Sequence, residues 1–553
     1  MPSTEHSVVP ENGADSGQIA RLAQRVGRIP VPIIICGLFG LWLATFVQTL
    51  SDGVRPDQAL SSADVLLAVI LHLPYLMLML FLAFGFAERI GYFFHARAPF
   101  AGGNLPDQLP KVCIQLPMFN EDAVACRIID AAAAIDWPLH RLEIEVLDDS
   151  TDADTQAMVR AHCEALGRRS GIAIHWMHRA DRSGYKAGAL EAGRNVTDAD
   201  FIAIFDADFL PPADYLRRAI PHFYDPAGKP LLDLGLVQAQ WGHLNDAASP
   251  LTAAQALWVD DHHTLQQSWR SAVLGFVNFT GTAGVWRAQA LEDAGGWRSA
   301  SLVEDCEISF RALFAGYRTK FVKELVVPAE LPQSIAAYRS QQKRWTQGWA
   351  QLQRLHLGRL LFDYRTPLRR KAVLTYMMCI SWQWPLWLTW IIIFPFLMSK
   401  GLSLAAYGTT AGLIAYLAPP LGFALFSGIV ANIESRATYT DGHGKLRSGV
   451  AGRCGRIIPY LVINAAMLAH HAAPFSKGCS ARCTPNLSAR QRPRRFRAAR
   501  SPRKRKRWPP SPSASWSARA MHWPRAVLLR RRSAGFPPLS PPGRCSRRRG
   551  RHG

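Results

Sequence analysis

Two pairs of carboxylates in this sequence lie where a run of apolar residues ends. Asp206 and Asp208 stand one residue apart after the run 201–205, and Asp148 and Asp149 close an earlier run. Two carboxylates so spaced at a strand end, where the chain turns, can together hold a hard divalent cation that keeps open positions for diphosphate oxygens. A carboxylate of the other pair can accept hydrogen bonds from a nucleobase imide or a ribose hydroxyl. The two pairs therefore point to a nucleoside diphosphate and a divalent cation.

Each of these motifs is weak evidence when it is taken alone. An Asp-x-Asp is more often a solvated turn or a helix cap, and Lys186, in the small-residue stretch 182–189, would alone more often be a surface lysine. Their order changes the interpretation, because five polar constellations follow one another in one soluble block. They are DDS at 148–150, DAD at 206–208, GTAG at 281–284, VED at 303–305 and QQKRW at 341–345. Five such motifs in this order rarely occur together by chance in one sequence.

These motifs need a scaffold that brings strand ends together. Across residues 111–330, short β-type runs alternate with helical stretches, and three of the runs lead straight into polar or acidic residues. The strand-like runs are 112–116, 144–147, 172–177 and 201–205. This alternation is typical of an α/β domain whose site lies at the carboxyl ends of parallel strands.

Long apolar blocks flank the soluble block and predict an integral, multi-pass membrane protein. The first block is long enough to span a bilayer and has no small-residue cleavage site after it. Spans are expected at about 30–50, 63–87, 372–399 and 403–432. The apolar stretch 457–473 is marginally long enough to cross, so it is either a fifth span or a helix lying in the interface.

The basic residues near the first two spans predict the orientation of the chain. Arg21, Arg25 and Arg28 precede the first span, whereas the loop after it carries only Arg55 as a basic residue. By the positive-inside rule the N-terminus is cytoplasmic, and the chain returns to the cytoplasm before residue 100. The expected order is a polar cytoplasmic N-terminus at 1–29, two transmembrane helices within 30–99, a cytoplasmic catalytic domain at 100–360, a membrane region at 361–475 and a basic tail at 476–553.

The net charge of the chain comes entirely from its C-terminal tail. Of the 64 Lys and Arg residues, 23 lie in 476–553, which has no Asp or Glu, so the 41 basic residues that remain balance 41 acidic ones. The net charge of +23 therefore does not indicate a nucleic-acid partner for the enzyme domain. The ten cysteines are scattered without CxxC spacing or a companion histidine cluster, which favours free thiols in a reducing compartment and no zinc site.

Nine stretches within about residues 110–350 resemble family 2 glycosyltransferases of the cellulose-synthase superfamily. They are QLPMFNE, VLDDSTD, GYKAGAL, AIFDADF, GTAGVWR, EDAGGW, LVEDCEISFRA, ELPQS and QQKRWTQG. In combination they are most like the plant cellulose-synthase-like A and C groups, whose A group includes glucomannan 4-β-mannosyltransferases. The resemblance implies a single GT-A domain, Rossmann-like with a mixed sheet, between transmembrane helices. One departure is Thr280, which stands where the family usually has Asn.

The resemblance also implies roles for the donor-side residues. Asp148 and Asp149 would hold the nucleoside, and Lys186 would contact the diphosphate. Asp206 and Asp208 would hold Mg²⁺ or Mn²⁺ against that diphosphate, so that the donor is a nucleotide sugar such as UDP-glucose or GDP-mannose.

Asp305 is the expected general base of the reaction. A sugar hydroxyl is a poor nucleophile at neutral pH, so a positioned carboxylate must take its proton as it attacks the anomeric carbon. One direct displacement inverts the anomeric configuration and turns an α-linked donor into a β-linked product. Glu304 is expected to be structural, because alternate residues on an extended segment face opposite ways.

Gln341, Arg344 and Trp345 are expected to form the acceptor and diphosphate end of the site. The Trp345 face can stack on a pyranose ring, and Arg344 can neutralise phosphate charge. Without the Gln-x-x-Arg-Trp spacing, an interfacial anchor would be the better interpretation of this tryptophan. The DDHH stretch at 260–263 is either a metal cluster, which we consider the weaker alternative, or part of an acceptor groove.

The basic tail at 476–553 is either a disordered segment or the product of a frameshift. Residues 473–491, back-translated with suitable synonymous codons and read from the third base, give AVLEGLFGAVHPEFVRTP. This string resembles the family's segment that ends in EFVRTP, similar to the loop that gates cellulose synthase. A frameshift near 470–473 would account for it, and would favour the interfacial placement of 457–473. Resequencing the gene tests this hypothesis.

Three functions remain open from the sequence. The first is a processive synthase that extends a β-linked glycan and passes it towards membrane lipids. The second is a non-processive enzyme that places one sugar on a lipid acceptor and shares every donor-side motif. The third is an inactive relic or a scaffold with a frameshifted C-terminus. The sequence gives neither the sugar nor the nucleotide.

Overall fold

The computed structural model describes residues 36–37, 39–40, 43–44, 61–99, 102–364, 366–399, 410–439 and 449–480. The predicted span 30–50 lies almost entirely outside these residues, and so does the predicted tail beyond residue 480. The predictions for those segments therefore stay predictions.

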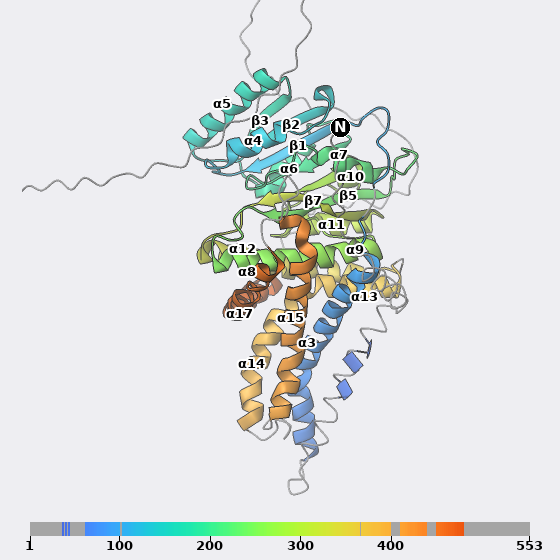
Figure 1. The fold of residues 1–553 in the computed structure, drawn as a ribbon, viewed down its shortest axis with the longest axis vertical. Helices are drawn as coiled ribbons and strands as arrows, with labels where there is room; N and C mark the ends of the chain where they lie inside the picture. The colour runs from blue at the N-terminus through green and yellow to red at the C-terminus, as the bar shows by residue number, and fades with distance from the viewer. Residues whose placement is uncertain are drawn as a thin grey trace, which may run out of the picture. The chain divides into compact units, whose positions relative to one another are not determined.

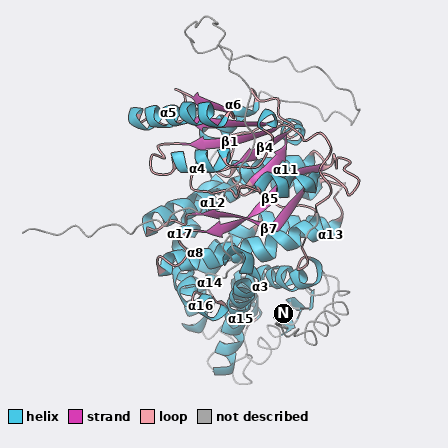
Figure 2. Ribbon diagram, turned by 45° about the horizontal axis from the view of Figure 1, so that its top comes forward, coloured by secondary structure: helices cyan, strands magenta, loops and turns pink. Residues whose placement is uncertain are grey.

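A seven-stranded mixed sheet forms the centre of the soluble domain, and its strands appear in magenta in Figure 2. The strand order is β3-β2-β1-β4-β6-β5-β7. The strands are β1 Val112–Met118, β2 Leu142–Asp148, β3 Ala173–His178, β4 Phe201–Ile204, β5 Leu234–His243, β6 Gly284–Arg287 and β7 Arg318–Ala329. The first four are mutually parallel, β6 is antiparallel to both β4 and β5, and β7 runs parallel to β5. The predicted α/β domain with a mixed sheet is confirmed.

The central strands are buried on both faces and mainly apolar, with the buried polar residues Gln115, Glu143, Glu145 and Asp148 in β1 and β2. Every residue of β1, β2 and β4 is buried, as expected where helices cover both sides of parallel strands. The helices of this domain are α4 Ala125–Ala133, α5 Ala153–Ser170, α6 Tyr185–Arg194, α7 Tyr215–Ala219, α8 Pro250–Asp260, α9 Ser268–Leu274, α10 Ala288–Asp293, α11 Glu304–Phe314 and α12 Ile335–Phe362. A π-helical segment, Asp261–Gln267, joins α8 to α9.

The apolar helices α3 Ser62–His95, α14 Gln383–Ser399 and α15 Thr410–Glu434 lie beside one another below the sheet in Figure 1. The helices packed with them are α13 Leu368–Met378, α16 Val450–Cys454 and α17 Ile457–Ser480. Three described stretches, 62–95, 380–397 and 450–480, are long and apolar enough to cross a membrane. Helix α3 contacts both α14 and α15.

The helix expected at 372–399 is interrupted, and Gln353 of α12 stabilises the break. Its side-chain amide donates to the Met378 carbonyl at 2.8 Å and to Ser381 Oγ at 2.9 Å. Trp382 Nε1 donates to Gln353 Oε1 at 2.8 Å. These bonds hold a 3₁₀ turn, Ile380–Trp382, between α13 and α14. The interruption depends on a tertiary partner, so the apolar run alone did not predict it.

Helix α17 covers the stretch whose placement the sequence left open. Its composition and length allow a span, yet it contacts α12 and α8 of the soluble domain as well as α14. In Figure 1 it lies across the direction of α14 and α15. This packing favours the interfacial alternative, which stays a prediction.

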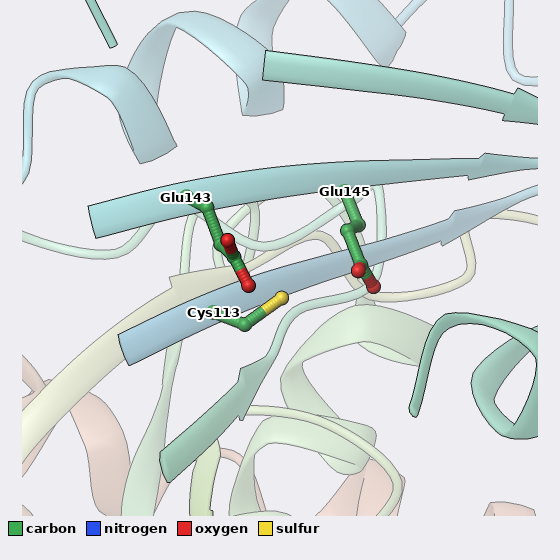
Figure 3. A group of neighbouring side chains, drawn as sticks. All are labelled: Cys113, Glu143 and Glu145. Atoms are coloured by element: carbon green, nitrogen blue, oxygen red, sulfur yellow. The ribbon is translucent and has the colours of Figure 1, made fainter. Parts of the chain in front are cut away.

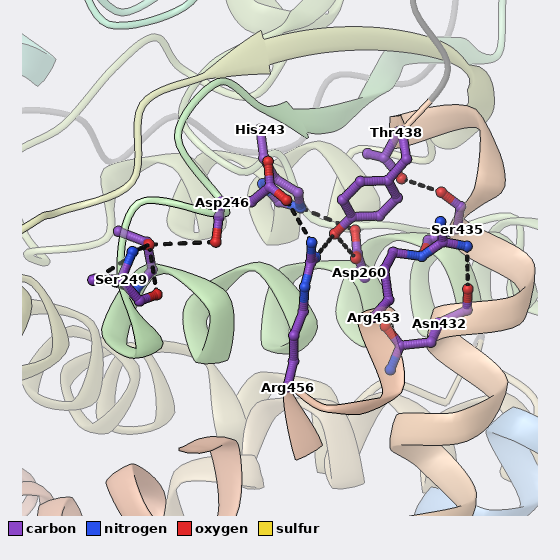
Figure 4. A network of polar contacts seen from close by, with 11 residues as sticks. His243, Asp246, Ser249, Asp260, Asn432, Ser435, Thr438, Arg453 and Arg456 are labelled. Carbon is purple, nitrogen blue, oxygen red and sulfur yellow. Dashed lines mark hydrogen bonds and ion pairs between the residues drawn. The ribbon is translucent and has the colours of Figure 1, made fainter. Parts of the chain in front are cut away.

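A buried set of polar side chains, here called the junction network, ties the segments that follow α15 to the soluble domain (Figure 4). Arg456 donates to Asp246 Oδ2 at 2.5 Å and to the Tyr439 hydroxyl at 2.6 Å. The Tyr439 hydroxyl donates to Asp260 Oδ2 at 2.5 Å, and His243 Nε2 lies 3.0 Å from Asp260 Oδ1. Tyr439 and Arg456 are therefore both bound to carboxylates of the soluble domain.

Gly91 marks a close approach of α3 to the soluble domain. A Cβ at this position would lie 2.8 Å from Trp269 Cδ1 and closer still to its Nε1. We expect Gly91→Ala to lower the free energy of unfolding by about 1–3 kcal/mol, the usual cost of overpacking. Thermal unfolding of the detergent-purified chain would measure this loss. Gly358→Ala in α12 is the matched control, since no atom lies within 4 Å of its Cβ position, and a melting temperature equal in both variants would contradict the prediction.

Candidate active site

Asp206 lies just beyond the carboxyl end of β4 and is bound to Lys186. The Lys186 ammonium donates to Asp206 Oδ1 at 2.5 Å and to the Gly281 carbonyl at 3.0 Å. The Asp206 backbone N–H donates to Thr282 Oγ1 at 2.9 Å, which fixes the turn after the strand. Lys186 stands in the first turn of α6. The GYKAGAL, DAD and GTAG motifs therefore meet at one point.

Asp305 joins this group from the first turn of α11. A Cβ placed on Gly281 would lie 3.0 Å from Asp305 Oδ2 and 3.7 Å from Lys186 Nζ, so the GTAG motif is close to both the carboxylate and the ammonium. Gly281 has a φ of 87°, which disfavours any side chain there. Asp305 Oδ1 accepts from the Cys306 backbone N–H at 2.7 Å. The structure thus brings Asp206, Lys186 and Asp305 together.

The carboxylates of the site affect one another strongly. Burial and the neighbouring Glu304 carboxylate raise the pKa of Asp305 to about 7. Burial and the Asp206 carboxylate raise the pKa of Asp208 to about 7. Burial alone would lower the pKa of Lys186, but the carboxylates of Asp206, Glu304 and Asp305 outweigh it and the pKa is raised.

Glu121, in the QLPMFNE motif after β1, is a further carboxylate at this edge that the sequence did not single out. Burial and the Asp206 carboxylate raise its pKa, and its charge contributes to the raised pKa of Asp208. Three carboxylates that disfavour one another's charge are a fitting donor set for a hard divalent cation, which would relieve that repulsion. The chemistry of these donors suits Mg²⁺ or Mn²⁺, but the group of ligand atoms found within 4.8 Å of one another among the described residues is a different one, Cys113 with Glu143 and Glu145.

Asp148 and Asp149 lie at the carboxyl end of β2 but in different surroundings. Asp149 accepts two hydrogen bonds from Arg179, at 2.8 Å from Nε and 2.5 Å from a terminal nitrogen. Asp148 is fully buried, and its two oxygens accept from the Ser150 backbone N–H at 2.9 Å and from Trp176 Nε1 at 3.0 Å. The sequence analysis missed Arg179, which directly follows β3. Its pairing with Asp149 depends on how β3 packs beside β2.

The Gln-x-x-Arg-Trp residues lie on α12 at positions i, i+3 and i+4, which share one broad face of a helix. Trp345 lines a cavity beside Asp305. Arg344 is exposed and Gln341 is half-buried, and neither lines the cavity. Gln342 is buried and does line it. Within this motif the structure therefore brings Trp345, and the unpredicted Gln342, to the Asp305 side.

The cavity extends from the soluble domain into the apolar helices and has a volume of about 250 Å³. Asp305, Thr280, Trp258 and Trp345 form part of its lining. The apolar helices contribute Phe81 of α3, Tyr376 of α13, Trp384 and Trp387 of α14, Phe423 of α15 and Tyr460 of α17. The expected base thus shares one continuous cavity with the helices that are candidates for membrane spans.

The DDHH stretch contributes to this cavity with three of its four residues. Asp261, His262 and His263 line it. Asp260 does not, because its carboxylate belongs to the junction network. Their position agrees with the groove alternative rather than with a ligand set.

Cys113, Glu143 and Glu145 are close enough together to hold a metal ion, as Figure 3 shows on β1 and β2. Other groups already bind their oxygens: Lys111 Nζ lies 2.5 Å from Glu143 Oε2, Thr197 donates to Glu143 Oε1, and Gln115 donates to Glu145 Oε2 at 2.9 Å. Burial raises the pKa of the Cys113 thiol far above its usual range, so it stays protonated. We interpret this cluster as a satisfied polar core, which lies along the first half and the middle of β1 and β2, before the strand ends where Asp206 lies.

Two family models match overlapping parts of the chain. Residues 113–229 match the family described as Glycosyl transferase family 2, and residues 201–426 match Glycosyl transferase family group 2. Among curated proteins, the chain is 40% identical over 270 residues to glucomannan 4-beta-mannosyltransferase 1 of Oryza sativa subsp. japonica, covering 48% of this chain and 51% of the relative. It is 39% identical over 270 residues to the protein of the same name from Cyamopsis tetragonoloba, covering 48% of this chain and 50% of that relative. The chain therefore spans about half the length of these relatives, and the resemblance predicted from the motifs is confirmed.

Two solved structures are similar at low identity. A mannosyltransferase from Pyrobaculum calidifontis, in complex with GDP-Man and Mn²⁺, is 19% identical with a TM-score of 0.47, over 66% of this chain and 97% of that one. Residues 1–349 of TarS from S. aureus are 13% identical with a TM-score of 0.33, over 64% of this chain and 90% of that one.

Proposed function

We propose that this chain, a family 2 glycosyltransferase by its motifs and its family matches, extends a β-glycan at a membrane. It would transfer a hexose from a nucleotide sugar, UDP-glucose or GDP-mannose, with inversion at the anomeric carbon and over many cycles. The observation that carries the proposal is the cavity that Asp305 shares with the apolar helices. The curated relatives, named as glucomannan mannosyltransferases, support the sugar class.

On the donor side, the proposal assigns the diphosphate to Lys186 and the nucleoside to Asp149, with Asp148 holding the turn beside it. Asp206 and Asp208, with Glu121 beside them, would hold Mg²⁺ or Mn²⁺. The bound ion would offset the negative charge that develops on the departing nucleoside diphosphate. Lys186 is already oriented for the same task by its bonds to Asp206 and Gly281.

On the acceptor side, Asp305 takes the proton of the attacking sugar hydroxyl. The acceptor oxygen forms a bond to the anomeric carbon while the bond from that carbon to the diphosphate oxygen breaks. The proton ends on Asp305, and the electron pair of the broken bond leaves with the nucleoside diphosphate. Burial of Asp305 favours this role, since a raised pKa makes the carboxylate a stronger base than an exposed one.

The placement of the domain follows from the ends of the helices. Arg97, just after α3, lies 3.1 Å from Glu434 at the end of α15. Both helices therefore end on the side of the soluble domain, and we place that side in the cytoplasm, as the basic residues predict. The protein would then be an integral, multi-pass membrane enzyme.

Product length tests the proposal against its alternatives. The purified chain would be offered radiolabelled UDP-glucose and GDP-mannose together with a short β-linked oligosaccharide or diacylglycerol. A ladder of long β-linked products supports processive synthesis, and the label identifies the sugar. A single sugar on the lipid would favour the glycolipid alternative. Donor consumption no faster than with Asp305→Asn would indicate an inactive relic.

The raised pKa of Asp305 predicts an acid limb in the pH dependence of transfer. Its carboxylate must be ionised to accept the proton, so with a pKa of about 7 we expect kcat/KM to fall about tenfold per pH unit below that value. Saturating Mn²⁺ keeps Asp208, whose pKa is also raised, ionised during the measurement. An acid limb near pH 4, the value of an ordinary carboxyl group, would contradict the prediction.

A further inference from the structure

The π-helical segment Asp261–Gln267 faces the cavity between the soluble domain and the apolar helices. It follows α8 without a break, and Asp261, His262, His263 and Gln266 line the cavity. A π-helix widens the turn and re-aims its side chains, and such segments are frequent at functional sites. None of the reaction steps assigned above uses these residues.

Three planar side chains form a stacked row along the cavity, here called the ring row. The Trp345 and Trp258 rings are 5.5 Å apart between centroids at an interplanar angle of 26°. The Trp258 and His262 rings are 5.6 Å apart at 14°. All three residues line the cavity. The row therefore links the Gln-x-x-Arg-Trp motif on α12 to the π-helical segment.

The hydrogen bonds around His262 define which nitrogen carries its proton. In the amide orientation that satisfies both ends of Gln266, its oxygen accepts from Arg89 at 2.8 and 3.0 Å, and its nitrogen donates to His262 Nδ1 at 2.7 Å. Nδ1 is then an acceptor, so the proton is on Nε2. Among the described residues, no hydrogen-bond partner is found for Nε2.

The imidazole of His262 is neutral at physiological pH. Burial, followed by the charge of Arg270, lowers its pKa to about 4. The cations near it are themselves paired, since Arg89 binds Asp261 and Arg270 Nε lies 2.7 Å from Glu88 Oε1. The cavity thus offers a neutral N–H donor among balanced charges. This chemistry suits the oxygens of an uncharged polyhydroxyl ligand rather than a phosphate.

We propose that His262 binds the acceptor glycan, donating a hydrogen bond from Nε2 to a sugar oxygen within the cavity that the ring row lines. Gln266 and Arg89 act as positioning residues, because they hold the tautomer that can donate. The identity of the ligand as a β-linked glycan rests on the proposed function. The residue contributes to acceptor affinity and not to donor binding.

Binding of cellohexaose and mannohexaose to the detergent-purified full chain, measured by calorimetry, tests the inference without any turnover. His262→Phe keeps a planar ring and loses the N–H, so we expect about a tenfold weaker Kd, the factor that one hydrogen bond contributes. His262→Gln retains a side-chain N–H donor and should restore part of the affinity. Gln266→Leu removes the donor to Nδ1 and should weaken binding as well. His175→Phe, at an exposed position on β3, is the matched control and should bind like the parent chain.

Unchanged hexaose affinity in His262→Phe would overturn the inference. It would also be overturned if phosphatidylglycerol competed for the cavity as well as the hexaoses do. Failure of the parent chain to bind either hexaose would also overturn it. Release of nucleoside diphosphate, measured on the same preparations, reports the proposed function separately. A chain that binds the hexaoses through His262 but consumes no donor would contradict the proposed function and leave this inference standing.

Discussion

Asp305→Asn should reduce the rate of sugar transfer by about a thousandfold, within the range that a positioned general base contributes. The amide cannot accept the proton of the attacking hydroxyl, and the Asp305 carboxylate lines the cavity together with Thr280. The fold should tolerate the change, because the raised pKa shows that the buried site already accommodates a neutral side chain at little cost.

The measurement is product formation under saturating donor, together with donor affinity and thermal unfolding of the same variant. We expect donor affinity and melting temperature to stay close to those of the parent chain. Asp154→Asn, an exposed position in the first turn of α5, controls for loss of a carboxylate as such. Transfer within threefold of the parent rate in Asp305→Asn would remove Asp305 from the mechanism.

Asn in place of both Asp206 and Asp208 should abolish the response of transfer to divalent cations. The expected loss is on the order of a thousandfold, since a bound cation contributes several kcal/mol of charge stabilisation. Asn side chains keep the size of the originals but offer no negative charge to the ion. The same change frees Lys186 from its ion pair with Asp206. Relative to the parent chain, the donor affinity of the double variant should therefore fall much less when it is measured without metal than when it is measured with metal.

Titration of Mn²⁺ against activity and against donor binding measures both effects, with Asp214→Asn on the surface as the matched control. In the parent chain, chelation of the metal should produce the same loss as the double substitution. A double variant that still responds to Mn²⁺ would place the cation elsewhere.

The strands could be predicted closely because β1, β2 and β4 are buried on both faces. β4 is apolar throughout, and β1 and β2 are apolar apart from Gln115, Glu143, Glu145 and the final Asp148. Each strand ends where an acidic motif begins, so both the strands and the edge of the site could be predicted. The predicted runs included none of β5, β6 and β7. The antiparallel strand β6 is only four residues long. It pairs with β4 and β5, and no local sequence pattern predicts such a pairing.

The site could be predicted in its acidic centre and not in its surroundings. Asp206 and Asp305 carry family motifs, whereas Arg179 and Glu121 matter through partners far away in sequence. The two acidic residues of the DDS motif look equivalent in sequence, yet one is buried beneath Trp176 and the other faces Arg179. Which oxygen meets which partner depends on the packing of β3 against β2.

The junction network has a consequence for how a growing product could advance. A hinge motion between the soluble domain and the helix bundle would have to break the buried pair between Arg456 and Asp246, and breaking a buried pair costs about 3–5 kcal/mol. We therefore expect the two parts to move as one rigid body during a catalytic cycle. Each one-sugar advance of the polymer would then rely on local rearrangements of side chains and loops, with the opening into the bundle staying aligned with the site of bond formation.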